Sequence, residues 1–533
     1  MRKTTLLASA VLLASTTCGF AATTSDDAAK VKTALQAYIG SGVDAVTITP
    51  DGDGFKVSLD MTGLFTTASQ GKAEMAVSPF DFRLAPMGAG KWKVTRDGAY
   101  ELKAKSNGYE MNEKFGKLTL DGEYDEALAA FTRFDSTATD ITFSQTMTDE
   151  TARQISTSGK IASADFKSTS AANTAGGVDV KFTETFGATE LTQDINAKAD
   201  TKAGTKAEGN PDTQAKPDDN SDDSANDGDA GSSKGKVTLG ESKPEPAAPA
   251  DPAAPPLHLH ATSSGGDASG TITGVKSAAL LNLMKFIAVH PDDKVSAVDQ
   301  DVLKPLLRDV LPVFANSTGT GTFNTIEAET PIGAFKLAKI SLASNFNGAV
   351  KDGKLEQTVS MTGLELPAGL VPSWAQALVT KDFDLGISVS GYDIETFLKA
   401  EIDAADFSKD IPIPKEIEDK NAQLLLPKGA VDVAVTQSNI SNDTYALKAT
   451  GTMQAGPSAL PTGKAHIALK GLDDVMKAIQ ASPPEAGLQQ YTSVIVVAKG
   501  MAKAEDGGLA WDIASSPDGK IMVNGIDVNS LKQ

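Results

Sequence analysis

Two of the four histidines in this chain stand one residue apart, in the sequence His258-Leu259-His260. On a β-strand this spacing places both imidazole rings on one face, where they could supply half of a metal site. The other two, His290 and His466, have no metal-ligand spacing around them, and no HExxH, paired CxxC or EF-hand loop occurs. We therefore interpret His258 and His260 as a surface pair at the start of a strand. The sequence predicts no metal site.

Phosphate-binding and nucleophile motifs are equally weak. Residues 231–236 (GSSKGK) have glycines and lysines in a suggestive order, but no strand precedes them and no helix follows. Gly456-Pro457-Ser458 lacks the second glycine of a nucleophile elbow, and its proline removes a backbone donor. Acidic residues are too numerous and too scattered to single out a catalytic pair. We predict no catalytic residue and no cofactor, and a hydrolase is only the third of the functional alternatives.

The N-terminus has the pattern of a secretory signal peptide over residues 1–21. Arg2 and Lys3 precede a short apolar run, and Gly19 and Ala21 occupy the −3 and −1 positions of a cleavage site, which places the mature start at Ala22. The run is shorter than the roughly twenty residues of a membrane span. We therefore expect an exported, periplasmic protein.

Cys18 is the only cysteine of the chain and suggests an alternative. In a lipoprotein leader it would become the lipidated first residue, but Ser15-Thr16-Thr17 before it lacks the usual leucine and small-residue pattern. If Cys18 is removed with the leader, the mature protein has no thiol, which suits an oxidising compartment. Cysteine nucleophiles and cysteine metal sites are then excluded.

The charge of the chain limits its partners. It carries 49 Lys and Arg against 69 Asp and Glu, a net charge of −20, and no run of basic residues forms a patch. Nucleic acid and anionic membrane surfaces are therefore not expected as partners. No transmembrane span is expected either, because even the apolar stretch 277–289 is short and is interrupted by Asn282 and Lys285.

A low-complexity segment, residues 197–256, divides the chain. It has no aromatic residue, is first acidic and then rich in proline and alanine, and contains only Val237 and Leu239 as large aliphatic residues. Such a composition cannot bury enough apolar surface to offset the entropy of ordering. We predict a disordered tether between an N-terminal block, residues 22–196, and a C-terminal block, residues 257–533. The blocks could be two bodies, or one continuous body with an inserted loop, which we favour.

Both blocks show the alternation of apolar and polar residues that indicates antiparallel strands joined by tight turns. Stretches such as FKVSLDM, VDVKFTETF and AVDVAVTQS would face water on one side and a core on the other. We predict an α+β fold, predominantly β, with extended antiparallel meander sheets and a few covering helices. One helix is expected to begin at Ser25, and others are expected at residues 124–134, 277–290, 374–379, 394–404 and 473–481. Residues 296–315 should form two short helices because prolines interrupt them. Residues 491–501 are expected to be a strand.

Two apolar helical stretches, residues 280–289 and 303–314, have two interpretations. They could cover the open face of a sheet as part of its core. Alternatively, they could form the lid or end cap of a groove in which the uncovered apolar side of a long sheet binds acyl chains or another extended ligand.

Short phrases of the C-terminal block resemble a known family. They are Leu370-Val371-Pro372, Gly391-Tyr392-Asp393, LLLPKG at 424–429, Gly471-Leu472-Asp473 and GKIMVNG at 519–525. From about residue 270 onward the chain is similar to the uncharacterised exported Gram-negative proteins called domain of unknown function 2125. The resemblance implies an extended, β-rich periplasmic protein without a known catalytic site, and it assigns no residue a role.

Two functions are consistent with these patterns. The first is a non-enzymatic periplasmic protein that binds or passes a lipid-like envelope component along an apolar β surface. The second is a structural or interaction module that bridges envelope proteins. The first requires an uncovered apolar face and the second does not, so the arrangement of the sheet bears on the choice between them.

Overall fold

The structure of the chain is a computed structural model that describes residues 23–39, 45–60, 62, 74–106, 108–148, 153–196, 257–290, 295–457 and 459–528. The predicted leader, residues 1–21, and the predicted tether, residues 197–256, lie outside these described residues, as do the GSSKGK stretch and Ser458.

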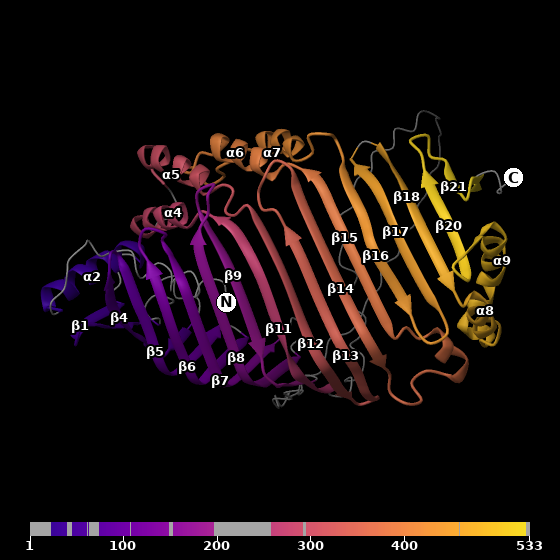
Figure 1. Ribbon diagram of the computed structural model, residues 1–533, viewed down its shortest axis with the longest axis horizontal. Coiled ribbons are helices and arrows are strands. Elements are labelled where there is room, and N and C mark those ends of the chain that lie inside the picture. Colours follow the sequence, from indigo (N-terminus) through magenta and orange to yellow (C-terminus); the bar gives the residue numbers. More distant parts are fainter. Residues whose placement is uncertain are drawn as a thin grey trace, which may run out of the picture.

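The described residues form one 22-stranded sheet in which every neighbouring pair is antiparallel. Consecutive strands are neighbours over most of its length, so the sheet is a meander that runs from the N-terminal to the C-terminal end (Figure 1). The predominantly β fold with few helices is thereby confirmed. The strands before residue 197 are β1 Val46–Asp51, β2 Gly54–Leu59, β3 Glu74–Val77, β4 Phe80–Gly88, β5 Lys91–Ser106, β6 Tyr109–Asp125, β7 Ala130–Thr148, β8 Gln154–Ala172, β9 Val178–Phe186 and β10 Thr189–Asn196.

The strands after residue 256 continue the same sheet. Strands β9 and β10 both lie between β8 and β11, each pairing with a different part of them, and β19 pairs with β20. The strands are β11 Leu257–Val275, β12 Asn316–Thr330, β13 Gly333–Phe346, β14 Gly353–Glu365, β15 Asp382–Tyr392, β16 Val431–Ser441, β17 Ala446–Gly456, β18 Ala459–Lys470, β19 Lys503–Glu505, β20 Gly508–Ser515, β21 Ile521–Val523 and β22 Ile526–Asp527.

The two blocks of the sequence meet at β10 and β11. Ile195, next to the end of β10, pairs with Leu257, the first residue of β11. The ends of the segment 197–256 therefore leave and re-enter the sheet at the same place, and the sheet runs without a break from one block into the other.

The helices lie at the margins of the sheet and do not form a second layer over its centre (Figure 1). Helix α2 lies at the N-terminal end, α4 to α7 follow one long edge, and α8 and α9 lie at the C-terminal end. Their bounds are α2 Ser25–Ile39, α4 Ser277–Val289, α5 Ala297–Val310, α6 Ile394–Ala404, α7 Lys415–Asn421, α8 Leu472–Gln480 and α9 Thr492–Met501, with 3-10 turns at Ser373–Leu378, Ala422–Leu425, Pro484–Ala486 and Leu488–Tyr491. No helix of the described residues is long and apolar enough to cross a membrane.

The largest hydrophobic core lies at the N-terminal end. Helix α2 buries Val31 and Leu35 against the first strands of the sheet, where Phe55 and Tyr124 are fully buried. The helix is capped by Thr24, whose Oγ1 accepts a hydrogen bond from the backbone N–H of Asp27 at 3.2 Å. This end is therefore a two-layered domain core in the ordinary sense.

Two of the expected helices are wrong in detail. Residues 124–134 are the end of β6, a turn and the start of β7. Tyr124 on β6 pairs with Phe131 on β7, and Phe134 lies further along β7 with its ring against that of Phe131. Residues 296–315 contain one helix, α5, and not two. Pro305 lies inside it and leaves the carbonyl group of Asp301 without its helical donor, but Asp301 is exposed and water can replace that donor.

A third correction concerns residues 491–501, which were expected to be a strand and form helix α9. Its five β-branched residues favour strands. However, the indole Nε1 of Trp511 donates to the carbonyl group of Ala498, at 2.7 Å, and the side-chain amide of Asn524 donates to that of Met501, also at 2.7 Å. These tertiary hydrogen bonds satisfy the C-terminal carbonyl groups of a helix, so packing outweighs the local preference.

Candidate functional site

The two faces of the sheet differ in chemistry throughout its length. Residues directly opposite each other on antiparallel strands point to the same face, so the register sorts the side chains. On β12 and β13, Phe323 pairs with Ile340, whereas the next position pairs Asn324 with Lys339. The same division continues on the neighbouring strands, which gives one apolar face and one polar face.

The apolar face contains an uninterrupted row of non-polar residues that crosses thirteen strands. Each member pairs directly with the next, and we call this row the apolar track. At roughly 4.8 Å per strand it is about 60 Å long. Its residues are Leu118, Ala138, Ala164, Phe186, Gly266, Phe323, Ile340, Met361, Phe383, Ile440, Leu447, Leu469 and Leu509.

Gly266 keeps the track continuous at the junction of the two blocks. A Cβ at this position would lie 2.1 Å from the carbonyl oxygen of Thr322, so a larger residue does not fit. The rings of Phe186 and Phe323, on the two strands beside it, stack over this gap with centroids 6.1 Å apart. The glycine therefore lets aromatic side chains bridge the position where a side chain is missing.

The middle of the apolar face is exposed to solvent. The exposed fractions are 40% for Phe323, 49% for Leu342, 39% for Ile387 and 41% for Met453, and all four point to the apolar face. No helix of the described residues lies over strands β12 to β17 in Figure 1. An apolar surface that spans many strands and that none of the described helices covers is typical of a binding surface.

Three charged side chains interrupt the apolar face, all in the N-terminal half. Arg96 lies 4.4 Å from the centroid of the Phe80 ring and donates to the carbonyl groups of Asp81 and Ala99. Burial raises the pKa of Glu113 and of Glu184. Burial therefore favours the neutral forms of these carboxyl groups, which limits the polarity of the face there.

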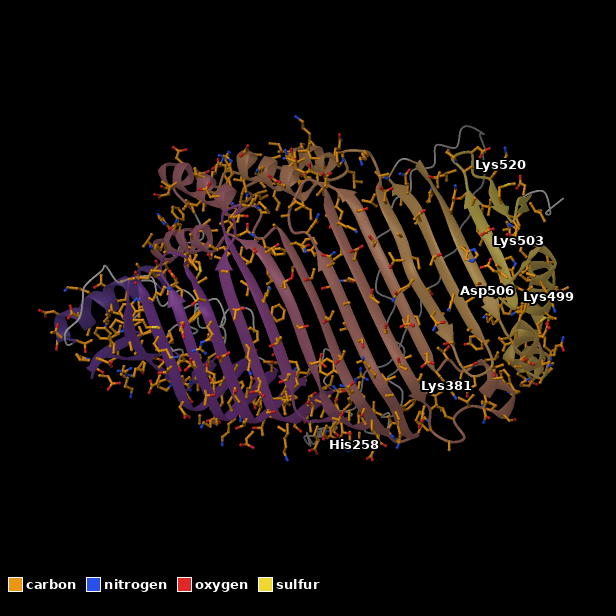
Figure 2. The ribbon with its side chains drawn as sticks, in the orientation of Figure 1. His258, Lys381, Lys499, Lys503, Asp506 and Lys520 are labelled. Atoms are coloured by element: carbon orange, nitrogen blue, oxygen red, sulfur yellow. The ribbon has the colours of Figure 1, made fainter. Side chains whose placement is uncertain are left out.

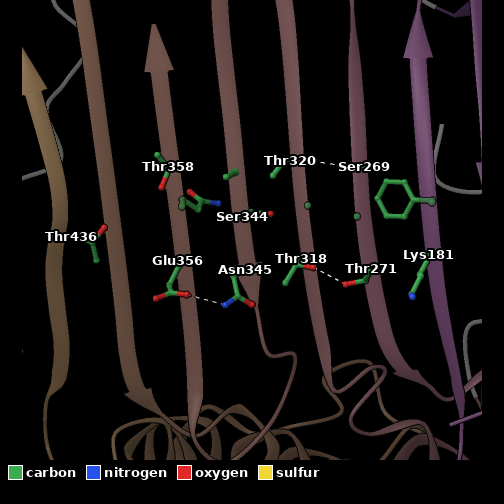
Figure 3. A pocket seen from close by; sticks show the side chains of 15 residues that line it. Lys181, Ser269, Thr271, Thr318, Thr320, Ser344, Asn345, Glu356, Thr358 and Thr436 are labelled. Atoms are coloured by element: carbon green, nitrogen blue, oxygen red, sulfur yellow. Dashed lines mark hydrogen bonds between the residues drawn. The ribbon is translucent and has the colours of Figure 1, made fainter.

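The polar face carries a shallow cavity of about 610 Å³ over strands β9 to β16 (Figure 3). Its polar side chains are bonded to one another across the strands: Thr271 to Thr318 at 2.7 Å, and Asn345 to Glu356 at 2.8 Å. Groups that satisfy each other in this way stabilise strand pairing and do not present free donors to a ligand.

A second polar cluster joins the last strands. His466 on β18 is 2.9 Å from Asp512 through Nδ1 and 3.2 Å from Glu505 through Nε2, and Lys503 donates to Asp512 at 2.8 Å. The carboxylate of Asp512, assisted by that of Glu505, raises the pKa of His466. This charge network holds β18, β19 and β20 together on the polar face.

The histidine pair of the sequence is on the polar face, at one long margin of the sheet, where Figure 2 shows His258. His258 pairs with Asp194 at 2.7 Å, and His260 is 3.3 Å from the hydroxyl of Thr192. His290 instead approaches Asp299, at 3.5 Å. Across the described ranges no three His, Cys, Asp or Glu side chains are grouped so that they could hold a metal ion.

The apolar track was only partly visible in the sequence. Alternation along single strands indicated one apolar side, but the row across strands depends on register, which the alternation of one strand does not give. Searches with this chain find no matching family model, no matching curated protein and no matching solved structure. The resemblance to domain of unknown function 2125 therefore stays a prediction.

Proposed function

We propose that this protein binds the acyl chains of an amphiphile along the apolar track and carries them without chemical change. The observation that supports this most is the row from Leu118 to Leu509, in which no polar side chain occurs over thirteen strands. An extended aliphatic ligand matches such a surface because it needs contact area and no hydrogen-bond partner.

The segment 197–256 is an unsuitable cover for this face. Its composition offers only Val237 and Leu239 as large aliphatic side chains and no aromatic ring. Burying about 60 Å of track requires far more apolar surface than these residues can supply. The proposed occupant is therefore a molecule other than this segment.

The place of action in this proposal is the periplasm. It rests on the signal-peptide pattern of residues 1–21, with a mature start at Ala22, and on the implied membership of an exported Gram-negative family. In that compartment an amphiphile needs a protein surface to shield its acyl chains from water while it is outside a membrane.

Native mass spectrometry of the mature protein, purified from its own envelope without detergent, tests the proposal. We expect co-purifying molecules whose masses and fragments identify acyl chains. A protein that is repeatedly free of lipid, or that forms a dimer closed over the apolar faces, contradicts it.

A pair of matched variants makes this test specific. Leu342→Glu places a charge on the exposed apolar face, and Thr362→Glu places the same side chain on the polar face, opposite Lys339. The first should lose most of the bound lipid, because a carboxylate cannot be buried unpaired against an acyl chain. The second should keep it, and circular dichroism should show both variants folded.

A further inference from the structure

Helix α9 exposes an apolar surface at the C-terminal end of the sheet. Val494, Val496 and Val497 are each more than half exposed, and so is Tyr491 just before the helix. Tyr491, Val494 and Val497 recur at a spacing of three and therefore form one stripe. An apolar helix face that the described residues leave uncovered is a candidate contact surface for an apolar partner.

The helix lies on the same side of the sheet as the apolar track. Trp511 on β20 pairs with Ile467 on β18 and points to the apolar face, and its indole N–H reaches the carbonyl group of Ala498 in α9 at 2.7 Å. Leu509, the last residue of the track, lies two positions before Trp511 on the same strand. Trp511 therefore attaches α9 to the end of the sheet that carries the last residue of the track.

The charges around α9 are unusual for this acidic chain. Residues 488–502 contain no acidic residue and one basic residue, Lys499, in a protein of net charge −20. Lys499 pairs with Asp473 of α8 at 2.5 Å and is seen beside α9 in Figure 2. The stripe is thus apolar and close to neutral, which suits a zwitterionic bilayer surface and gives no attraction to an anionic one.

We propose that helix α9 docks onto a zwitterionic lipid bilayer and that acyl chains pass between the bilayer and the apolar track at this end. The inference rests on the proposed acyl-chain binding, which it deepens by assigning the site of exchange. Shallow insertion of the valines, with Tyr491 at the headgroup level, accounts for their exposure in the free protein.

Flotation of the full mature protein with vesicles of phosphatidylethanolamine and phosphatidylcholine tests the docking. The wild type should float with the vesicles, and Val494→Glu/Val497→Glu should partition into them at least about tenfold less, because two carboxylates would have to enter the bilayer interface. Ile287→Glu/Val289→Glu is the matched control in α4, where both residues are equally exposed, and it should float like the wild type.

The outcomes separate docking from acyl-chain binding. Leu342→Glu should float normally although it has lost its lipid, and the α9 variant should retain lipid acquired in the cell but exchange it slowly with vesicles. A wild type that stays in solution, or an α9 variant that floats equally well, overturns the docking proposal. Sedimentation that shows dimers broken by Val494→Glu/Val497→Glu also overturns it and assigns α9 to self-association. Floating protein without any acyl chain would retain α9 docking and refute the proposed function.

Discussion

The two ends of the sheet are closed by helices of opposite character. Helix α2 buries Ala28, Val31 and Leu35 against the first strands and leaves Asp26 and Lys30 exposed. Helix α9 exposes its valines and makes polar contacts to Trp511, Asn524 and Asp473. Apolar burial, the main source of folding stability, is therefore concentrated at the N-terminal end of the sheet. The rest of the sheet depends more on strand pairing and leaves its apolar side available.

The largest expected difference between the two regions is in the effect of shortening a leucine. Leu35 is 1% exposed in the N-terminal core, and Leu342 is 49% exposed on the apolar face. Leu35→Ala should lower the free energy of unfolding by about 2–5 kcal/mol, because it leaves a cavity. Leu342→Ala should cost less than about 1 kcal/mol, because little buried surface is lost. Urea unfolding of lipid-free protein measures both, and equal costs would contradict the contrast.

A smaller effect is expected when a hydrogen bond that holds α9 is removed. Trp511→Phe keeps the apolar ring but loses the indole donor to Ala498. The change should weaken the attachment of α9 by about 1 kcal/mol, which is roughly a fivefold faster local opening. Hydrogen exchange of the amides in α9 measures this opening, and the amides of α2 serve as the control. If α9 exchanges at the same rate in both proteins, the polar contacts are not what holds this helix.

The smallest expected effect is a pH dependence at the C-terminal end. The pKa of His466 is raised mainly by Asp512, so protonation of this histidine stabilises the folded state. Its contribution is fully present below the ordinary histidine pKa of about 6.5 and is lost as the pH rises through the higher pKa of the folded protein.

The effect should be small because His466 is partly exposed and solvent screens its ion pairs. Hydrogen exchange of strands β18 to β20 should therefore be slightly faster at pH 8.5 than at pH 6, after correction for intrinsic rates. His466→Gln should abolish that difference. A pH dependence that persists in the variant would assign it to other groups.

Helices with strong local signals were predictable from the sequence. Residues 394–404 match α6, whose cap Asp393 accepts from the backbone N–H of Thr396 at 2.8 Å, and residues 277–290 match α4. The residues of α9 were not predictable in this way, because the information that makes them helical lies in Trp511 and Asn524, which come later in the chain. Helix propensity is a local property of the residues and does not include the effect of such tertiary partners.

The candidate site, like the helices, was only partly predictable from the sequence. That each strand has one apolar side followed from alternation, as for Ile340 and Leu342 on β13. That the apolar sides align into one track, and that the helices leave its middle open, depends on register and on the placement of helices at the margins. Neither is encoded by a pattern within one strand.

The pairing of Ile195 with Leu257 has a consequence for how the protein can be assembled. The chain leaves and rejoins the sheet at adjacent positions, so the covalent link through residues 197–256 is not needed to define the neighbours of β11. Two polypeptides, one ending after residue 196 and the other beginning before residue 257, contain complementary strand edges and should combine in a one-to-one complex. The same site would accept an inserted reporter domain, because closing a longer loop costs little additional entropy.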